Sequence, residues 1–333
     1  MKKKIHIFFI VVILIILFTV PRVFSVFTTD IFVYFGITVL FAVSLNLLAY
    51  CGLYSLGHAL FFGIGAYTTA LGLLHIEGLP LWSALLLGGL VSGLFGLIVS
   101  PLLVRVSGVY FTLLTIALNQ IMYAICLKFS EVTSGENGIA GYPIPPLNIP
   151  GIGSFDMGNK TYFYYFAILL IVIGIWIMWF VTKTPLGGIM LGIRDNQERV
   201  TYLGHRVPVA KTIIFVISGF FAGIAGSFFA LWLNVVDPMS TLHLVHVSIL
   251  TFLAILVGGL GTFIGPFFGV GIIVLFDQII LTYGRTANMV IGLVTIVYLL
   301  YAPRYTPWGI MGIYERIKHY GSDRRTYDHQ VIK

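Results

Sequence analysis

The feature that most constrains this chain is a succession of long apolar runs, of which residues 162–181 are the clearest. A helix needs about 20 predominantly apolar residues to cross a bilayer. Of the 333 residues, 59% are hydrophobic and 9% are charged, whereas about a quarter of the residues of a soluble globular protein are charged. The runs therefore predict an all-α polytopic membrane protein. They exclude a soluble enzyme, a nucleic-acid-binding domain and a disordered chain, and they argue against a β-barrel, whose strands alternate polar and apolar residues.

The runs divide into ten candidate spans within a single domain over residues 1–333. The second and third spans run together near residues 50–55, so one span followed by a re-entrant segment is the alternative there. The first run follows the sequence MKKK and also resembles a signal peptide, but large residues around the possible cleavage site favour a retained helix. The expected bounds are 5–27, 31–51, 54–75, 81–104, 107–127, 161–182, 212–234, 243–260, 264–281 and 287–303.

The distribution of lysine and arginine predicts the orientation of these spans, because cytoplasmic loops carry an excess of both residues. With both termini in the cytoplasm, four of the 19 basic residues lie outside and the other fifteen lie inside. The four outside are Arg22, Lys128, Lys160 and Arg285. The same orientation makes residues 183–211 a cytoplasmic loop, residues 128–160 an external loop and residues 304–333 a cytoplasmic tail.

Two glycine-rich segments, 54–67 and 258–271, interrupt the plain apolar pattern. Each contains a Leu-Gly pair and then FFG-x-G, as FFGIG at 61–65 and FFGVG at 267–271. Glycines let helices approach closely, or they mark unwound backbone, which occurs at membrane depth only inside protein or along a wet cavity. Both interpretations apply, and broken helices at matching places in two halves would be typical of a transporter. The glycines concerned are Gly57, Gly63, Gly65, Gly258, Gly259 and Gly261.

Polar residues inside the spans are few, and no span carries the central carboxylate on which ion-coupled carriers often depend. The fifth span is the most polar, and its Thr112, Thr115 and Asn119 share one helical face by their i, i+3, i+7 spacing. Threonine hydroxyls can instead bond the preceding turn, and a buried histidine is often only a structural group. We nevertheless predict a polar path lined by Ser55, His58, Thr112, Thr115 and Asn119.

The cytoplasmic loop 183–211 is the most informative segment. Residues 189–203 have helical character, with apolar Ile189, Ile193 and Val200 beside a mixed-charge cluster. A solvated amphipathic hairpin on the membrane surface is one interpretation. Mixed charge suits a protein contact better than attraction to lipid, so the other is a helix presented to a cytoplasmic partner. The cluster consists of Arg194, Asp195, Asn196, Gln197, Glu198 and Arg199.

The external loop 128–160 contains Pro143, Pro145, Pro146 and Pro150. Proline-rich segments are extended and stiff, so this loop is either a docking surface for an external partner or a connector.

The chain contains no Gly-Lys dipeptide and therefore no phosphate-binding loop of the G-x-x-x-x-G-K-[ST] type. It also lacks HExxH and CxxC motifs. We expect no catalytic residues, no metal site and no cofactor in this chain, so it is a passive conduit or a subunit that another chain drives. The loop 183–211 favours a driven subunit.

Five segments in the same order along the chain resemble the branched-chain amino acid ABC transporter permease family, of the LivM type. The combination of SLGHALFFGIGAY with IRDNQE is specific to this family, and either motif alone is less so. Family members often have I-R-E-N-E in place of I-R-D-N-Q. The five segments are 44–71, 105–121, 133–143, 184–205 and 254–272.

The resemblance implies a single permease domain in a bacterial plasma (inner) membrane. It also implies a second, LivH-like permease, two cytoplasmic ATPases that bind the ATP, and an external substrate-binding protein. Residues 194–199 would then form the coupling helix, and the permease pair would alternate between inward- and outward-facing states. The alternatives are a urea or short-amide permease of the same family, a stand-alone secondary carrier, and a scaffold protein without transport.

Overall fold

The computed structural model describes residues 19–23, 25–149 and 153–283. Six helices in these ranges are long and apolar enough to cross a membrane, and two shorter apolar helices accompany them. The chain is therefore an all-α polytopic membrane protein. The expected span 287–303, the tail 304–333 and most of the span 5–27 lie outside the described residues, so the count of ten spans and the cytoplasmic termini stay predictions.

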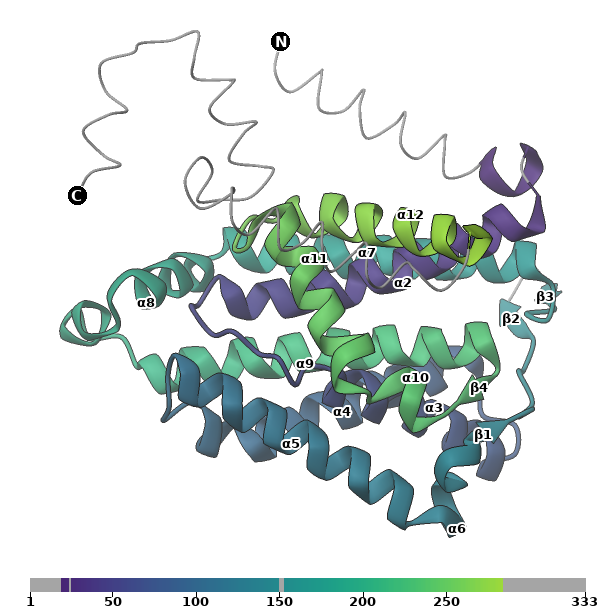
Figure 1. Cartoon of the computed structure of the whole chain (residues 1–333), viewed down its shortest axis with the longest axis horizontal. Helices are drawn as coiled ribbons and strands as arrows, with labels where there is room; N and C mark the ends of the chain where they lie inside the picture. The colour runs from purple at the N-terminus through teal and green to yellow at the C-terminus, as the bar shows by residue number, and fades with distance from the viewer. Residues whose placement is uncertain (1–18, 24, 150–152, 284–333) are drawn as a thin grey trace, which may run out of the picture.

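The helices lie side by side in a bundle (Figure 1). The long spans are α2 (Val26–Ala49), α4 (Leu81–Leu103), α5 (Val109–Lys128), α7 (Lys160–Lys183), α9 (Val207–Leu233) and the segment Pro238–Gly259. That last segment comprises α10 (Pro238–Thr241), a π-helical turn (Leu244–Ile249) and α11 (Leu250–Gly259). The shorter helices are α3 (Ala59–His75) and α12 (Gly265–Tyr283).

Four of the expected starts are wrong by five residues. The span expected over 243–260 begins at Pro238, and the other three starts differ for local reasons. The span expected over 31–51 begins at Val26, where the Ser25 hydroxyl accepts a bond from Thr28 N and caps α2. The span expected over 54–75 begins at Ala59, since residues 50–58 are not helical. The span expected over 212–234 begins at Val207, because Pro208 occupies the first turn, where its missing N–H has no consequence.

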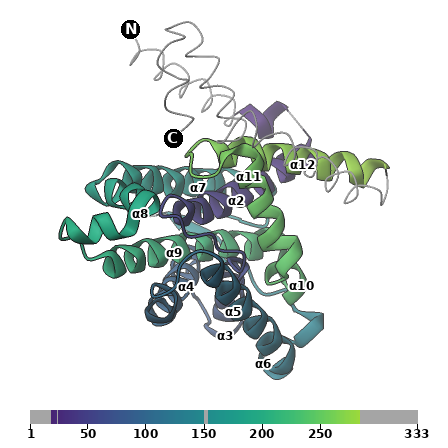
Figure 2. The same cartoon turned by 60° about the vertical axis from the view of Figure 1, so that its left-hand side comes forward.

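The two ends of the bundle differ. Figure 1 places α8 (Pro185–Tyr202) at one end and the short strands at the other. In Figure 2, too, α8 lies at the margin, beside the ends of α7 and α9. Arg105, Lys183 and Arg206 adjoin the α8 end, whereas Glu77 and Glu131 adjoin the opposite end. The predicted orientation assigns the basic, α8 end to the cytoplasm.

The loop 128–160 is folded rather than simply extended and stiff. It contains α6 (Ser130–Thr133), a 3₁₀ turn (Gly135–Asn137), β1 (Ile139–Ala140), β2 (Leu147–Ile149) and β3 (Gly153–Phe155). β2 pairs with β3, and β1 pairs antiparallel with β4 (Val235–Val236) directly after α9. Tyr142 is buried, its hydroxyl donates to Ala230 O, and burial raises its pKa. Backbone of the loop thus pairs with the residues that follow α9, and its Tyr142 side chain bonds to α9 itself, which proline content alone does not predict.

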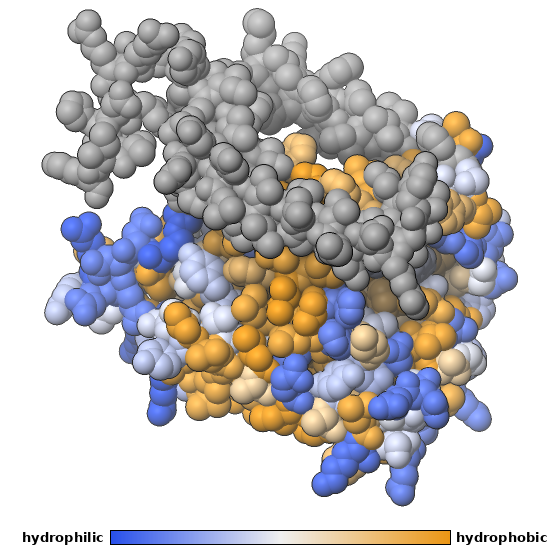
Figure 3. All heavy atoms as spheres, viewed as in Figure 1, coloured by the Kyte–Doolittle hydropathy of each residue, from blue (hydrophilic) through white to orange (hydrophobic). Residues whose placement is uncertain are grey.

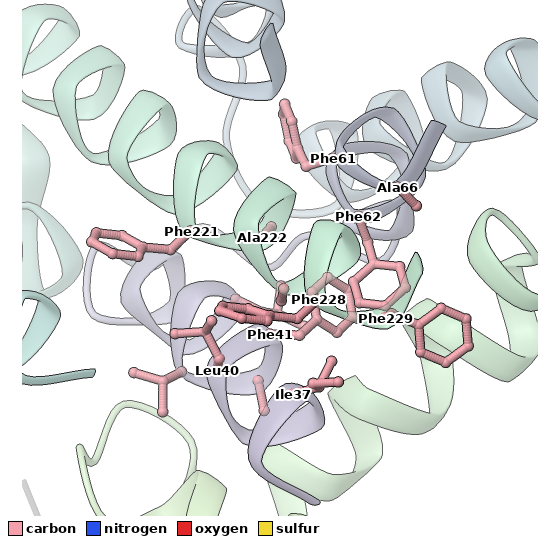
Figure 4. Close-up of a cluster of buried hydrophobic side chains, with 14 of the residues drawn as sticks. Ile37, Leu40, Phe41, Phe61, Phe62, Ala66, Phe221, Ala222, Phe228 and Phe229 are labelled. Atoms are coloured by element: carbon pink, nitrogen blue, oxygen red, sulfur yellow. The ribbon is translucent and has the colours of Figure 1, made fainter. Parts of the chain in front are cut away.

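α9 is the centre of the bundle and packs against α2, α3 and α4. The aromatic side chains Phe41, Phe62 and Phe229 interlock between α2, α3 and α9 (Figure 4). The Ser92 hydroxyl of α4 lies 2.8 Å from Gly219 O and 3.0 Å from Phe61 O. Short polar side chains thus bond carbonyls of neighbouring helices, a common form of association inside membranes.

Glycines bring α3 and α9 into backbone contact. A Cβ added at Gly65 would overlap the backbone of Gly223, and one added at Gly226 would overlap Phe62 O. Both helices also pack against α4, and α9 packs against α2 as well. Gly65 and Gly226 are therefore sites of close packing in regular helix, with no unwinding around them.

The outer faces of α4 and α7 are apolar. Leu90, Leu94 and Ile98 of α4 are all more than half exposed, as are Leu169 and Trp176 of α7. Figure 3 shows hydrophobic residues over much of the visible face between the two ends. These surfaces suit contact with lipid chains.

Substitution of Gly226 by alanine should destabilise the protein by about 1–3 kcal/mol, since the methyl group overpacks the contact with Phe62 O. Thermal unfolding of the purified chain in detergent measures this. Gly188→Ala is the matched control, because nothing lies within 4 Å of a Cβ there and alanine favours a helix by about 1 kcal/mol. Equal unfolding temperatures for both variants would contradict the packing role of Gly226.

Candidate functional site: a buried polar junction and an exposed helix

The bundle contains two helix breaks. Break 1 is residues 50–58, between α2 and α3, and break 2 is residues 260–264, between α11 and α12. The helix after each break begins two residues before its Phe-Phe-Gly motif, at Ala59 and at Gly265. The repeated FFG-x-G pattern therefore marks the restart of a helix in both places.

His58 ends break 1 and is completely buried. Its Nε2 lies 3.3 Å from both Ser44 Oγ and Ser218 Oγ. The hydroxyls of these serines donate to Phe41 O and Ser44 O, so their oxygens accept from His58 and the proton sits on Nε2. Nδ1 is then an acceptor, and it has no partner among the described residues.

The polar face of α5 lies against irregular backbone. Thr112 Oγ1 donates to Tyr54 O of break 1 at 2.7 Å, and Asn119 Nδ2 donates to Leu242 O at 2.9 Å. Thr115 bonds only within its own helix, to Thr112 O, but its carbonyl touches the position where a Cβ of Gly57 would lie. Two of the three side chains thus satisfy backbone groups that a regular helix would satisfy internally.

Three buried polar atoms at this junction have no partner among the described residues: Ser55 Oγ, His58 Nδ1 and Asn119 Oδ1. Buried polar groups are nearly always bonded, so each of these needs an explanation. The structure therefore brings the predicted path residues to one junction of break 1, α5 and Leu242, the residue that follows α10. We call this the polar junction: Ser55, His58, Thr112, Thr115 and Asn119.

The six predicted glycines divide into two kinds. Gly63 and Gly65 lie inside α3, and Gly258 lies in the last turn of α11 against Gly265. Gly57 lies in break 1 and leaves room for Thr115 O. Gly259 and Gly261 have φ values of 130° and 74°, which favour glycine. Backbone conformation thus requires glycine at break 2, whereas close approach requires it elsewhere.

Asn46 is a functional candidate that sequence analysis missed. It is buried in the last turns of α2, where its Oδ1 accepts from Gly261 N at 2.9 Å and its Nδ2 donates to Thr262 O at 2.7 Å. One amide therefore satisfies a donor and an acceptor of break 2. An isolated asparagine in the apolar run SLNLL was the available signal.

α8 is kinked at Asn196, whose φ of −160° and ψ of 103° are extended. Asn196 Oδ1 accepts from Arg199 N, which caps the short helical piece that follows. The expected helix over 189–203 is thus two pieces, and the six predicted coupling residues do not share one surface. Asp195, Asn196, Gln197, Glu198 and Arg199 are exposed, whereas the Arg194 side chain is 22% exposed and Ile193 and Val200 are buried.

The short piece presents an exposed surface. Tyr202 and Leu203 are 88% and 71% exposed, and with Asn196, Glu198 and Arg199 they line an open hollow of about 280 Å³. Behind it, the buried Lys211 of α9 donates to Gln197 Oε1 at 2.8 Å. In the sequence, Lys211 served only to predict the orientation of the spans. In the structure, its bond to Gln197 holds the short piece of α8 to the bundle.

Among the described residues, no cluster of three or more His, Cys, Asp or Glu side chains is arranged to hold a metal ion. Cys51 and Cys126 are both buried and free.

A bundle of apolar helices with broken segments and a buried polar junction is typical of a membrane transport protein. A family model described as "Branched-chain amino acid transport system / permease component" matches residues 27–299. The chain belongs to this family, which confirms the resemblance in its sequence.

Two curated relatives are named as branched-chain amino acid permeases, and another is named for guanosine. The chain is 28% identical to the high-affinity branched-chain amino acid transport system permease protein LivM of Salmonella typhimurium, over 76% of this chain and 63% of the relative. It is 26% identical to LivM of Escherichia coli, over 89% of this chain and 73% of the relative. The guanosine ABC transporter permease protein NupQ of Bacillus subtilis is 28% identical over 50% of this chain and 55% of NupQ. The match thus spans less than two thirds of the Salmonella protein, and no solved structure matches the chain.

Replacing Asn46 by alanine should destabilise the protein by about 1–3 kcal/mol, because a donor and an acceptor of break 2 lose their partner inside the bundle. Chemical or thermal unfolding in detergent measures the change. Asn148→Ala on the exposed strand β2 is the control and should leave stability unchanged. A loss no larger than the control's would remove Asn46 from this role.

Proposed function

We propose that this chain is the permease subunit of an ATP-driven importer of branched-chain amino acids in a bacterial plasma (inner) membrane. Residues 1–333 act as a single permease domain, and ATP is bound by partner subunits. The observation that carries the proposal is the short piece of α8, with exposed Tyr202 and Leu203, at the basic end of a bundle that belongs to a permease family. Exposed apolar residues beside charges are typical of a protein docking surface.

The proposed partners are those that membership of the permease family implies. One of two cytoplasmic ATPases docks on residues 194–199 and the adjoining surface, and a second, LivH-like permease completes the path. An external binding protein delivers substrate at the opposite end, where the folded loop 128–160 lies. ATP-driven movement of α8 switches the permease pair between inward- and outward-facing states.

The chemistry of the polar junction supports an amino acid as the solute. Within the part of the chain that the structure describes, His58 Nδ1 and Asn119 Oδ1 are acceptors without a partner, and Ser55 Oγ can also accept. An ammonium group has three donors and no acceptor. It therefore suits these three acceptor atoms better than a carboxylate does, which needs donors. The apolar surroundings, Phe41 and Phe61 around His58, suit an aliphatic side chain.

The alternatives are a urea or short-amide permease, another solute such as the nucleoside named for the Bacillus relative, and a stand-alone secondary carrier. The first experiment is affinity purification of the tagged chain from its native membrane in mild detergent. The proposal expects two ATPases and a second permease to accompany it, and expects leucine to compete for uptake while urea and guanosine do not. Recovery of the chain alone, with uptake that persists without ATP, would establish a secondary carrier instead.

Reversing the charges of Asp195 and Glu198 together should abolish ATP-driven uptake while the chain stays inserted, since both carboxylates are exposed on the proposed docking surface. Uptake in vesicles and recovery of the ATPases measure the effect. Reversal of Glu131 and Glu136, two exposed acids at the opposite end, is the control and should leave ATPase recovery unchanged. Normal uptake and normal recovery in the Asp195 and Glu198 variant would end the coupling assignment.

Substitution of Asn119 by leucine should reduce uptake by about tenfold or more, because the junction loses an acceptor and the bond to Leu242 O. ATPase recovery should persist, since α8 is untouched. Gln120→Leu is the matched control, because Gln120 is the neighbouring amide on the exposed face of α5. Equal uptake by the two variants would exclude the junction from the path.

A further inference from the structure

Arg194 lies between the two helix breaks. A Cβ added at Gly52 of break 1 would lie 3.4 Å from both Arg194 Cα and Cγ. A Cβ added at Gly261 of break 2 would lie 3.0 Å from Nη1 of the same arginine. The main chain and stem of Arg194 therefore rest on break 1, and its guanidinium reaches break 2.

Both contact points lack a side chain, and both have left-handed backbone. Gly52 has a φ of 72° and Gly261 a φ of 74°. Any other residue at Gly261 would be strained and would also crowd the guanidinium. The two glycines thus leave space for a single arginine from a third segment of the chain.

The positive charge of Arg194 between the two breaks has a physical reason. α2 ends at Ala49 and α11 ends at Gly259, so the C-terminal ends of two helices adjoin the breaks that Arg194 contacts. The last carbonyls of a helix carry partial negative charge and attract a cation. A guanidinium has five donors in a planar fork and can serve several carbonyls, whereas an ammonium is a point charge.

Arg194 also directly precedes the kink of α8. Asp195 follows it, with an oxygen 3.6 Å from Arg194 Nε, and Asn196 is the extended residue at which the two pieces meet. Beyond the kink, the exposed piece is tied to α9 through Gln197 and Lys211. The exposed piece can therefore displace Arg194 only through this hinge.

We infer that Arg194 is the positioning residue that transmits displacement of α8 to both helix breaks. Its stem holds the end of α2 at break 1, and its guanidinium holds break 2 at Gly261, beside the bonds that Asn46 makes to Gly261 and Thr262. The inference rests on the proposed function in one respect, that the ATPases move α8. The contacts with the breaks are properties of this chain alone.

Hydrogen exchange on the full chain in lipid nanodiscs tests the inference. Break 1 is reported by the amides of Cys51, Gly52 and Leu53, which donate to carbonyls of Leu48 and Ala49. Break 2 is reported by the amides of Gly261 and Thr262. Arg194→Ala should speed exchange at both places by about tenfold, the effect of losing a charged hydrogen-bonding group.

Arg194→Lys separates the two contacts. Lysine keeps an aliphatic stem at Gly52 but loses the fork at Gly261, so break 2 should exchange faster while break 1 stays protected. Arg199→Ala is the matched control, an exposed arginine beyond the kink, and should change neither break. If Arg194→Ala does not fold, the lysine variant carries the test.

Two outcomes overturn the inference: protection at break 2 that is unchanged in both Arg194 variants, or an equal effect from Arg199→Ala. In the assembled transporter, Arg194→Lys should keep ATPase recovery and ATP hydrolysis but transport severalfold less solute per ATP. Failure to recover ATPases with the wild-type chain would overturn the proposed function, whereas the exchange measurement would stand.

Discussion

The constraint on which this structure depends is that backbone polar groups inside a membrane protein need partners within the protein. Two helix breaks release such groups, and side chains from distant segments satisfy them. Asn46 serves break 2, Thr112 binds Tyr54 O of break 1, and Ser248 Oγ accepts from Ala59 N at 2.7 Å, where α3 begins. The position of each break is thus fixed by a polar residue on another helix, and the polar junction is a consequence of breaking a helix where water is absent.

These hydrogen bonds also require that the helices lie close together, and small residues make this possible. Polar side chains as short as serine reach a neighbouring carbonyl only where helices approach closely, and Gly65, Gly223 and Gly226 permit that approach along α9. Ser218 of the same helix then reaches both His58 and Ser44 O. Packing and polar satisfaction are therefore coupled: a larger residue on α9 would separate the helices and leave the hydroxyls without partners.

Several parts of this arrangement could be predicted from the sequence, because they depend on local periodicity. The i, i+3, i+7 spacing of Thr112, Thr115 and Asn119 put them on one face, and the repeated FFG-x-G pattern marked two interruptions. Asn46 and Lys211 could not be predicted, because their partners depend on how the helices pack: Gly261 lies 215 residues from Asn46. The kink at Asn196 was also missed, since the mixed charges of residues 194–199 have helical spacing, and only the capping bond from Arg199 N shows where the helix divides.

The two helix breaks and the glycine contacts between α3 and α9 differ in how strongly the structure holds them. Each break is held by a few separate hydrogen bonds, from side chains and from neighbouring backbone, and a typical bond of this kind contributes about 0.5–1.5 kcal/mol. The α3–α9 contact is held by interlocked backbones that leave no room for sliding. Segments of low local stability are the ones that move in conformational transitions. We therefore expect the glycine-packed core of α3, α4 and α9 to act as the fixed frame, and any change of shape to occur at the breaks, with α8 and α5 in contact with them.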